Sequence, residues 1–323
     1  MKRIFALIIL LQLGYCLEAS GAPEEEKSGF EGSVGIGVIF LNYSDNLDPN
    51  GSKKQLESLD AEADKEFTVM PFILPSLEYD IGKPDGGKLY LNTDPAIDEV
   101  GGFSINLGYS HPLVNVGIID VGVFINPLEE AWKDPYLTGV KRESTSSSRY
   151  GAKVALNRIL GTGLRMNVVY MKNDVDDDVI GELQPDLARD GAVYALNANY
   201  SLFASPSFEL RPQLSVRKGE YDGESNSFIK GKFDLEARYT IDKLTLQPRI
   251  FYSQSTYDKI DPIFTKTRTN DGYGAMMMVS YSAPFNLEHW TLQGLIGYSR
   301  GNSNITFYDT ESVSGGLFMS YRF

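Results

Sequence analysis

Charged and amide side chains recur at every second position in three neighbouring segments of this chain. The set comprises Glu209, Arg211, Gln213, Arg217, Lys232, Asp234, Glu236, Arg238, Gln247 and Arg249. A spacing of two places side chains on one face of a β-strand, so adjacent strands would bring both signs of charge onto one surface. That surface could line a water-filled pore and set its ion preference, or it could neutralise itself and fill the space. The candidate lumen or pore-lining residues are Arg211, Arg217, Lys232, Asp234, Glu236, Arg238 and Arg249.

The dipeptide Asp242-Lys243 between two of these segments suggests a register for the charges. A two-residue turn at this point would place Glu236 opposite Arg249 and Arg238 opposite Gln247. Asp-Lys is not a favoured two-residue turn, but a four-residue turn about the same centre gives the same register. We therefore expect these four side chains to share the inward face of a sheet.

Hydrolysis is the other chemistry to consider, because some membrane barrels are lipases or proteases that use histidine. The chain has two histidines, His111 and His289, and each falls beside an expected short turn. We expect both to be interfacial residues, with no catalytic residues in the chain.

The acidic run Asp174–Asp178 resembles the start of a calcium loop. The pattern then fails, because Val179 stands at the turn glycine and Pro185 at the bidentate glutamate. A solvated acidic loop is the better interpretation, and we expect no metal site and no cofactor.

The elements that would position these residues are strands, because apolar and polar residues alternate through most of the chain. The segments are 30–40, 67–81, 88–93, 103–110, 119–125, 150–156, 164–170, 192–203, 208–217, 229–241, 244–254, 273–282, 289–299 and 313–323. Long polar loops, such as 45–66 and 127–148, alternate with short turns. Apart from the residues named above, the inward positions are mainly Ser, Asn, Gly and Thr, which predicts a hydrated lumen. The pattern predicts an all-β, transmembrane, antiparallel up-and-down barrel of about fourteen strands, with twelve as the alternative.

The N-terminus has the features of an export signal. Lys2 and Arg3 precede the apolar run Ile4–Leu13, and small residues stand at Ala19 and Gly21. We expect a signal peptide at 1–21, a short lead at 22–29 and a single barrel domain at 30–323. No later stretch of about 18 apolar residues occurs, so a mature chain that spans a membrane would do so as a closed barrel.

Composition excludes two further classes. The formal net charge of −13 argues against a nucleic-acid partner. The single cysteine, Cys16, follows Tyr15, where lipid attachment needs a small residue, so we do not expect a lipoprotein.

Aromatic residues support a membrane location. Tyr321 and Phe323 resemble the assembly signal at the end of outer-membrane barrels, although Phe318 stands where a glycine is usual. An aromatic girdle is expected from Tyr109, Tyr194, Tyr200, Tyr239, Tyr273, Tyr281, Trp290 and Tyr298. The implied partners are the lipid bilayer, lipopolysaccharide and the outer-membrane assembly machinery; the oligomeric state is left open.

Three stretches are similar to an uncharacterised family of proteobacterial outer-membrane proteins, domain of unknown function 2860. They are Trp132–Leu137, Asp261–Arg268 and Asn302–Asp309. The resemblance implies a barrel in the outer membrane of a Gram-negative cell, and it supplies no activity. All three lie in expected outer loops, where Trp132, Phe264 and Phe307 could pack together over the mouth.

These features lead to one expectation and two alternatives. We expect a porin-like passive channel for small hydrophilic solutes. A non-conducting structural or adhesin-type barrel is the alternative, and an outer-membrane hydrolase is a more distant one.

Overall fold

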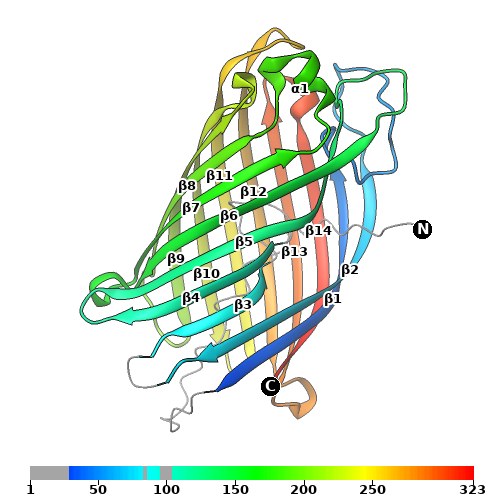
Figure 1. The fold of residues 1–323 in the computed structure, drawn as a ribbon. Helices are drawn as coiled ribbons and strands as arrows, with labels where there is room; N and C mark the ends of the chain where they lie inside the picture. Colours follow the sequence, from blue (N-terminus) through cyan, green and yellow to red (C-terminus); the bar gives the residue numbers. More distant parts are fainter. Residues whose placement is uncertain (1–28, 83–85, 95–103) are drawn as a thin grey trace.

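The computed structural model describes residues 29–82, 86–94 and 104–323, and in this part the chain forms a closed barrel of fourteen antiparallel strands (Figure 1). Each strand pairs with its neighbours in sequence, and β1 (Phe30–Ser44) pairs with β14 (Thr310–Arg322) to close the sheet. The remaining strands are β2 (Glu66–Asp80), β3 (Lys88–Asp94), β4 (Ser104–Leu113), β5 (Gly117–Trp132), β6 (Ser144–Asn157), β7 (Leu164–Val175), β8 (Gly191–Tyr200), β9 (Phe208–Tyr221), β10 (Phe228–Ile241), β11 (Leu244–Asp261), β12 (Lys266–Ser282) and β13 (Trp290–Ser303). The predicted all-β barrel with fourteen strands is confirmed. The expected signal peptide and residues 22–28 of the lead lie outside the described residues.

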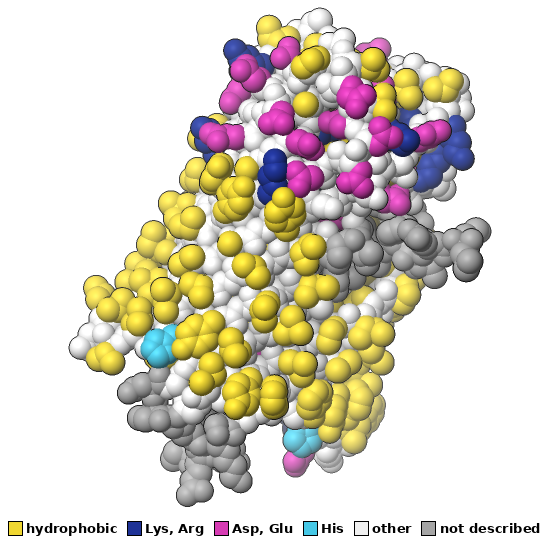
Figure 2. Space-filling model, in the orientation of Figure 1, with side chains coloured by type: hydrophobic (Ala, Val, Ile, Leu, Met, Phe, Trp, Pro, Cys, Tyr) yellow, Lys and Arg dark blue, Asp and Glu magenta, His cyan; other side chains and the backbone are white. Residues whose placement is uncertain are grey.

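The alternation of side chains gives the barrel an apolar exterior. In β1, Val34, Ile36 and Phe40 are exposed on the outside, whereas Ile39 and Leu41 are buried on the inside. Figure 2 shows apolar side chains over the middle and lower parts of the visible face and charged side chains gathered at the upper end. A closed barrel with such a band pairs its backbone groups internally and presents to its surroundings a surface that lipid can solvate.

Several strands are longer than a membrane crossing requires. Strand β11 has 18 residues and β12 has 17, whereas about 9–11 residues cross a bilayer. The expected loop 127–148 is too long by half, because β5 continues to Trp132 and β6 begins at Ser144, which leaves 133–143 as the connection. The strands therefore continue into the charged upper end, and the connection between β11 and β12 is only 262–265.

The turn between β10 and β11 has the expected register. Asp242 adopts the left-handed region with φ 50°, Ile241 pairs with Leu244, and Glu236 pairs with Arg249. This end of the barrel also holds the C-terminus (Figure 1). There Phe323 and Gly32 exchange two backbone hydrogen bonds, of 3.0 and 2.9 Å, which extend the β1–β14 seam.

Helical structure in the described part is confined to connections. It consists of α1 (Val179–Leu183) and the 3₁₀ turns η1 (Ile159–Gly161), η2 (Pro185–Leu187), η3 (Glu224–Asn226), η4 (Pro284–Asn286) and η5 (Thr306–Tyr308). None of these described helices is long and apolar enough to cross a membrane.

The lumen carries more apolar side chains than the sequence led us to expect. An apolar cluster lines the inner wall from β12 through β14 to β2, and its buried members are Ile39, Leu41, Tyr43, Met70, Phe72, Leu74, Met278, Leu295 and Phe318. Phe72 and Phe318 meet edge to face, with ring centroids 5.8 Å apart. A side chain at Gly37 would collide with the Phe318 Cβ and with the Phe72 ring. Phe318 thus covers a glycine on the neighbouring strand, and the expectation of a lumen lined mainly by small polar residues is wrong for this wall.

Candidate functional site

Seven of the predicted charged residues form ion pairs on the inner wall made by β9, β10 and β11, in a network with two centres. One centre of this network is Glu209, which accepts hydrogen bonds from Arg211 Nη2 at 3.0 Å, Arg238 Nη2 at 2.9 Å and Ser201 Oγ at 2.6 Å. Arg211 also reaches Glu236, with 3.3 Å between Nη1 and Oε1. Cross-strand pairing explains these contacts, because Glu209 lies opposite Arg238 and Arg211 lies opposite Glu236.

Asp234 is the second centre of the network. Its Oδ1 accepts hydrogen bonds from Nε and Nη2 of Arg249, at 3.0 and 2.7 Å, and lies 3.1 Å from Lys232 Nζ. Asp234 is 2% exposed and Arg249 is 7% exposed. Lys232 Nζ also lies 4.7 Å from the centre of the Phe251 ring.

The register was predicted correctly, but the ion pairs are diagonal. Arg249 lies opposite Glu236 in the ladder, yet it bonds to Asp234 while Glu236 is taken by Arg211 from the other side. The sequence left open whether the charges line a pore or neutralise each other. In the structure opposite charges pair along the wall, and we call these residues the charge network: Glu209, Arg211, Lys232, Asp234, Glu236, Arg238 and Arg249.

A packed cluster of apolar and aromatic side chains, which we call the cap, lies at the loop end of the barrel. It consists of Leu56, Leu59, Tyr136, Phe264, Ile305, Phe307 and Tyr308. Phe307 is 0% exposed, and its ring lies 5.3 Å from Phe264 and 5.3 Å from Tyr136. The expected contact between Phe264 and Phe307 is present. Trp132 instead packs under the Arg142 guanidinium at 4.1 Å and donates from Nε1 to the Asn46 carbonyl oxygen.

Polar contacts fasten the cap to the strands below it. Tyr308 Oη donates to Asp261 Oδ2 at 2.6 Å and lies 2.7 Å from Tyr136 Oη. Asn46 Nδ2 donates to the Phe307 carbonyl oxygen at 3.0 Å. Burial raises the pKa of Tyr136 to about 12 and also raises the pKa of Tyr308. Both phenols are therefore neutral at physiological pH, as this apolar setting requires.

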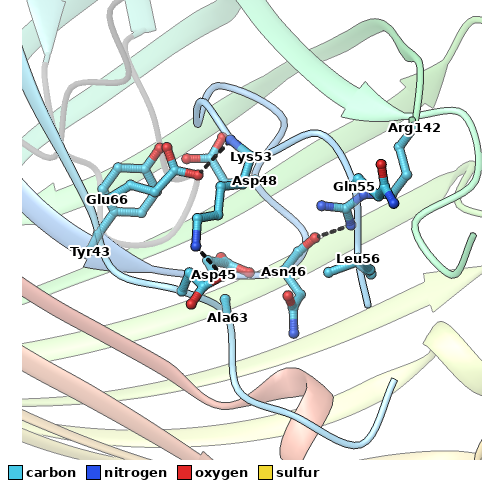
Figure 3. A pocket seen from close by; sticks show the side chains of 11 residues that line it. Tyr43, Asp45, Asn46, Asp48, Lys53, Gln55, Leu56, Ala63, Glu66 and Arg142 are labelled. Atoms are coloured by element: carbon cyan, nitrogen blue, oxygen red, sulfur yellow. Dashed lines mark hydrogen bonds and ion pairs between the residues drawn. The ribbon is translucent and has the colours of Figure 1, made fainter. Parts of the chain in front are cut away.

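A small cavity lies in the β1–β2 loop beside the cap (Figure 3). Its lining includes Asp45, Lys53, Glu66 and Arg142. Its volume of about 30 Å³ leaves room for about one water molecule. Burial raises the pKa of Asp45 to about 6, opposed by a hydrogen bond from the Leu47 N–H, and burial lowers the pKa of Arg142 to about 10. The loop thus holds a carboxyl group whose pKa lies above its ordinary value.

A larger cavity of about 320 Å³ lies between the cap and the wall formed by β9–β12. We call it the large cavity. Its lining residues are Asp45, Leu47, Arg217, Phe228, Lys230, Ser253, Ser255, Tyr257, Arg268, Asn270, Asp271, Gly272, Gly301, Tyr308 and Thr310. Arg217 is the one predicted pore-lining residue that lies here, while the other six belong to the charge network.

Sequence reasoning missed Lys230 and Arg268 as lumen residues. Lys230 shares the period of two with Lys232, so its inward position could have been read from the strand pattern. Arg268 stood in an expected outer loop because the adjacent strands were predicted to end at 254 and begin at 273. In the structure they run to Asp261 and start at Lys266.

The predicted girdle residues all face outward, and several of them meet across strands. Tyr170 and Tyr194 have ring centroids 5.5 Å apart, and Trp290 and Tyr321 have centroids 5.0 Å apart. The outward-facing girdle candidates are Tyr109, Tyr194, Tyr200, Tyr239, Tyr273, Tyr281, Trp290 and Tyr298. They form one row near the short turns and another toward the loops.

Both histidines lie at the short-turn end and contact tyrosine. His111 stacks on Tyr109, and its Nδ1 lies 3.1 Å from the Tyr109 hydroxyl. His289 meets the Tyr321 ring edge to face at 6.0 Å. These contacts are those of residues packed at the end of a barrel wall.

The acidic run Asp174–Asp178 is partly occupied by local contacts. Asp178 accepts from the Gly181 N–H at the start of α1 and binds Arg189 Nη2 at 2.6 Å. No group of three or more His, Cys, Asp or Glu residues in the described ranges is placed to hold a metal ion.

Solved structures with the same general architecture come from several bacteria. The outer membrane channel DcaP of Acinetobacter baumannii has 10% identity and a TM-score of 0.45, and the alignment covers 94% of this chain and 100% of DcaP. A loop L8 deletion mutant of OmpT, an outer membrane protein of Vibrio cholerae, has 9% identity and a TM-score of 0.44, with 92% and 99% coverage. Pseudomonas aeruginosa OpdQ has 10% identity and a TM-score of 0.42, with 91% and 97% coverage.

Sequence comparison gives a family. No curated protein matches the chain. The model of the family described as "Protein of unknown function (DUF2860)" matches residues 29–321, so the chain belongs to this family.

Proposed function

We propose that this protein is a passive outer-membrane channel for small hydrophilic solutes, with a lumen narrowed by its own side chains. The observation that carries the proposal is the large cavity, whose wall of charged and hydroxyl groups continues into the charge network of the same strands. Eight strands enclose an interior that side chains just fill, whereas 16 to 18 leave an aqueous channel. Fourteen strands lie between these cases, so a lumen with such a wall is expected to hold water.

The membrane placement follows from the exterior. The two aromatic rows are proposed as the girdles at the two bilayer surfaces, and Tyr321 with Phe323 as the signal for the assembly machinery. Residues 1–21 are proposed as the export signal. The charged upper end would then face lipopolysaccharide and the outside, and the short turns would face the periplasm.

A structural or adhesin-type barrel is the second candidate, and the cap favours it. Phe307 is fully buried among aromatic neighbours, and the charge network crosses three adjacent strands. A barrel closed by the cap and by the charge network would present its loops to the outside without passing solute. The two candidates have the same fold and differ in whether solute passes through the lumen.

We propose that the chain is not a hydrolase. Its two histidines lie at the short-turn end and contact tyrosines. A general base must lie within hydrogen-bond reach of the proton that it abstracts, and substrates from outside would arrive at the opposite end.

The proposed function is tested by the swelling of proteoliposomes that contain the refolded protein. We expect liposomes with the protein to swell in isotonic arabinose faster than liposomes without it. Protein that was never refolded serves as the control for leakage. Equal swelling rates in all three preparations would establish the non-conducting barrel instead.

A further inference from the structure

Arg268 is a buried cation with an unusual environment. It faces inward from β12, is 8% exposed, and its guanidinium lies between two rings, 3.5 Å from the centre of Tyr257 and 4.0 Å from the centre of Tyr308. Its Nε is buried without a hydrogen-bond partner. Within residues 29–82, 86–94 and 104–323, its contacts are these two rings, and no carboxylate forms an ion pair with it.

Two more cations share the large cavity with Arg268. Arg217 and Lys230 lie directly opposite each other on β9 and β10, and both line the cavity. Ser253, Ser255 and Asn270 add polar groups to the same lining. The lining therefore holds three cations against two carboxylates, Asp45 and Asp271, in a protein whose formal net charge is −13.

The two carboxylates of the cavity lining both accept hydrogen bonds from neutral groups. Asp271 accepts hydrogen bonds from Tyr252 Oη at 2.8 Å and from Gln254 Nε2 at 3.3 Å. Asp45 accepts the backbone N–H of Leu47 at 2.8 Å. Neither of these two carboxylates forms an ion pair with Arg268, although burial raises the pKa of Asp45 and the charge of Arg268 acts to lower it.

The stacking determines what Arg268 can bind. Tyr257 and Tyr308 both lie against the guanidinium, and its N–H donors point outward in the plane of the group, where they form a fork. A planar carboxylate, or two oxygens of a phosphate, fits such a fork with two parallel hydrogen bonds. A volume of about 320 Å³ is at the lower end of the range for small-molecule sites.

We infer that the large cavity is a binding site for the oxyanion group of a small organic solute, a carboxylate or a phosphate ester, held by Arg268 with Arg217 and Lys230. The site deepens the proposed function by naming the chemical class of its solute, and its role in transport rests on that function. Local positive charge would draw anions past an acidic exterior.

Isothermal titration of the refolded protein in detergent tests the site without requiring transport. The probes are benzoate, phenyl phosphate and the neutral benzamide. We expect saturable binding of at least one of the two anions and none of benzamide, and the anion that binds more tightly distinguishes carboxylate from phosphate. Benzamide binding equal to that of the anions, or the absence of saturable binding for all three, would overturn the inference.

Variants at Arg268 provide the second arm. Arg268→Gln removes the fork and is expected to weaken anion binding about tenfold or more, with Arg268→Lys intermediate because it keeps only a point charge. The control is Arg300→Gln, which removes a cation from the outward face of β13, where Arg300 bonds to Asn302. Unchanged affinity in Arg268→Gln would refute the site; if this variant does not fold, Arg268→Lys and the three probes decide.

The swelling assay separates this inference from the proposed function. Anion binding without arabinose entry would refute the channel and keep the site. Arabinose entry without anion binding would keep the channel and refute the site.

Discussion

Arg249 donates two hydrogen bonds, from Nε and Nη2, to a single oxygen of Asp234 on the neighbouring strand. The same oxygen also lies beside Lys232 Nζ, so two cations share one carboxylate in a buried part of the lumen wall. The pair is diagonal in the ladder, because the directly opposite Glu236 already binds Arg211. The ion pairs of this wall therefore join β9 to β10 and β10 to β11.

Removal of the central charge should destabilise the barrel. Asp234→Asn leaves Arg249 and Lys232 without a full counter-charge, and we expect it to lower the free energy of unfolding by about 3–5 kcal/mol. Urea unfolding of the refolded protein measures this loss. The control is Glu220→Gln, which breaks the exposed Lys218–Glu220 pair and should cost less than about 1 kcal/mol. Equal effects of the two changes would mean that the charge network does not stabilise the wall.

The end of the chain should be required for assembly. Deletion of Tyr321–Phe323 removes the two backbone bonds between Phe323 and Gly32 and the contact of Tyr321 with Trp290. We expect the truncated protein to be absent from the outer membrane and to lose the slower or faster gel migration that distinguishes unboiled from boiled barrels.

Tyr194→Ala is the control for this deletion, because it removes an outward ring that packs on Tyr170 in another part of the barrel. It should assemble normally. Normal amounts of the truncated protein in heat-modifiable form would show that β14 does not carry the assembly signal.

The sequence was sufficient for the part of the barrel with an apolar exterior and insufficient for its upper end. Alternation reveals strands where one face is apolar, which is why fourteen strands were predicted, and the Asp242-Lys243 turn predicted the Glu236–Arg249 register. In the charged upper end the alternation weakens, so the sequence does not predict the upper parts of β11 and β12 as strands. For this reason Arg268 was not predicted as a lumen residue.

The apolar wall was missed for a different physical reason. In β1 the apolar run continues through Ile39, Phe40 and Leu41, and only Phe40 of these faces outward. A run that is apolar on both faces gives no sign of which side faces a lumen. The partners that bury Ile39, such as Phe318 and Leu295, come from the far end of the chain and are known only from the closed sheet.

The β1–β2 loop should respond to pH through Asp45. Burial raises the pKa of this carboxyl above its ordinary value, to about 6, so the folded loop binds a proton more tightly than the unfolded chain does. The resulting stabilisation is complete below the ordinary pKa and is lost as the pH rises through about 6. Backbone hydrogen exchange in residues 45–65, corrected for intrinsic rates, should show stronger protection at pH 4 than at pH 7.5.

Asp45→Asn should abolish that difference, because its side chain does not titrate. Glu57→Gln in the same loop is the matched control and should retain it. A difference that persists in Asp45→Asn would assign the pH response to another group.

Opening of the cap should follow from the loss of its central ring. Phe307→Ala removes a fully buried aromatic side chain, which costs about 3–5 kcal/mol in a packed cluster, and it should increase arabinose entry into liposomes. Phe285→Ala is the control, since Phe285 is 92% exposed in the connection between β12 and β13. Identical entry rates for wild type, Phe307→Ala and Phe285→Ala would mean that the cap does not limit the path.

The central claim is that a continuous aqueous path crosses this barrel, and single-channel recording in a planar bilayer measures that path directly. We expect the refolded wild-type protein to give discrete conductance steps, and Phe307→Ala to give larger or longer openings than Phe285→Ala. The recording has the same meaning whether or not the oxyanion site exists, because potassium chloride carries the current. The absence of steps from heat-modifiable wild-type protein and from Phe307→Ala alike would contradict the claim and establish a closed barrel.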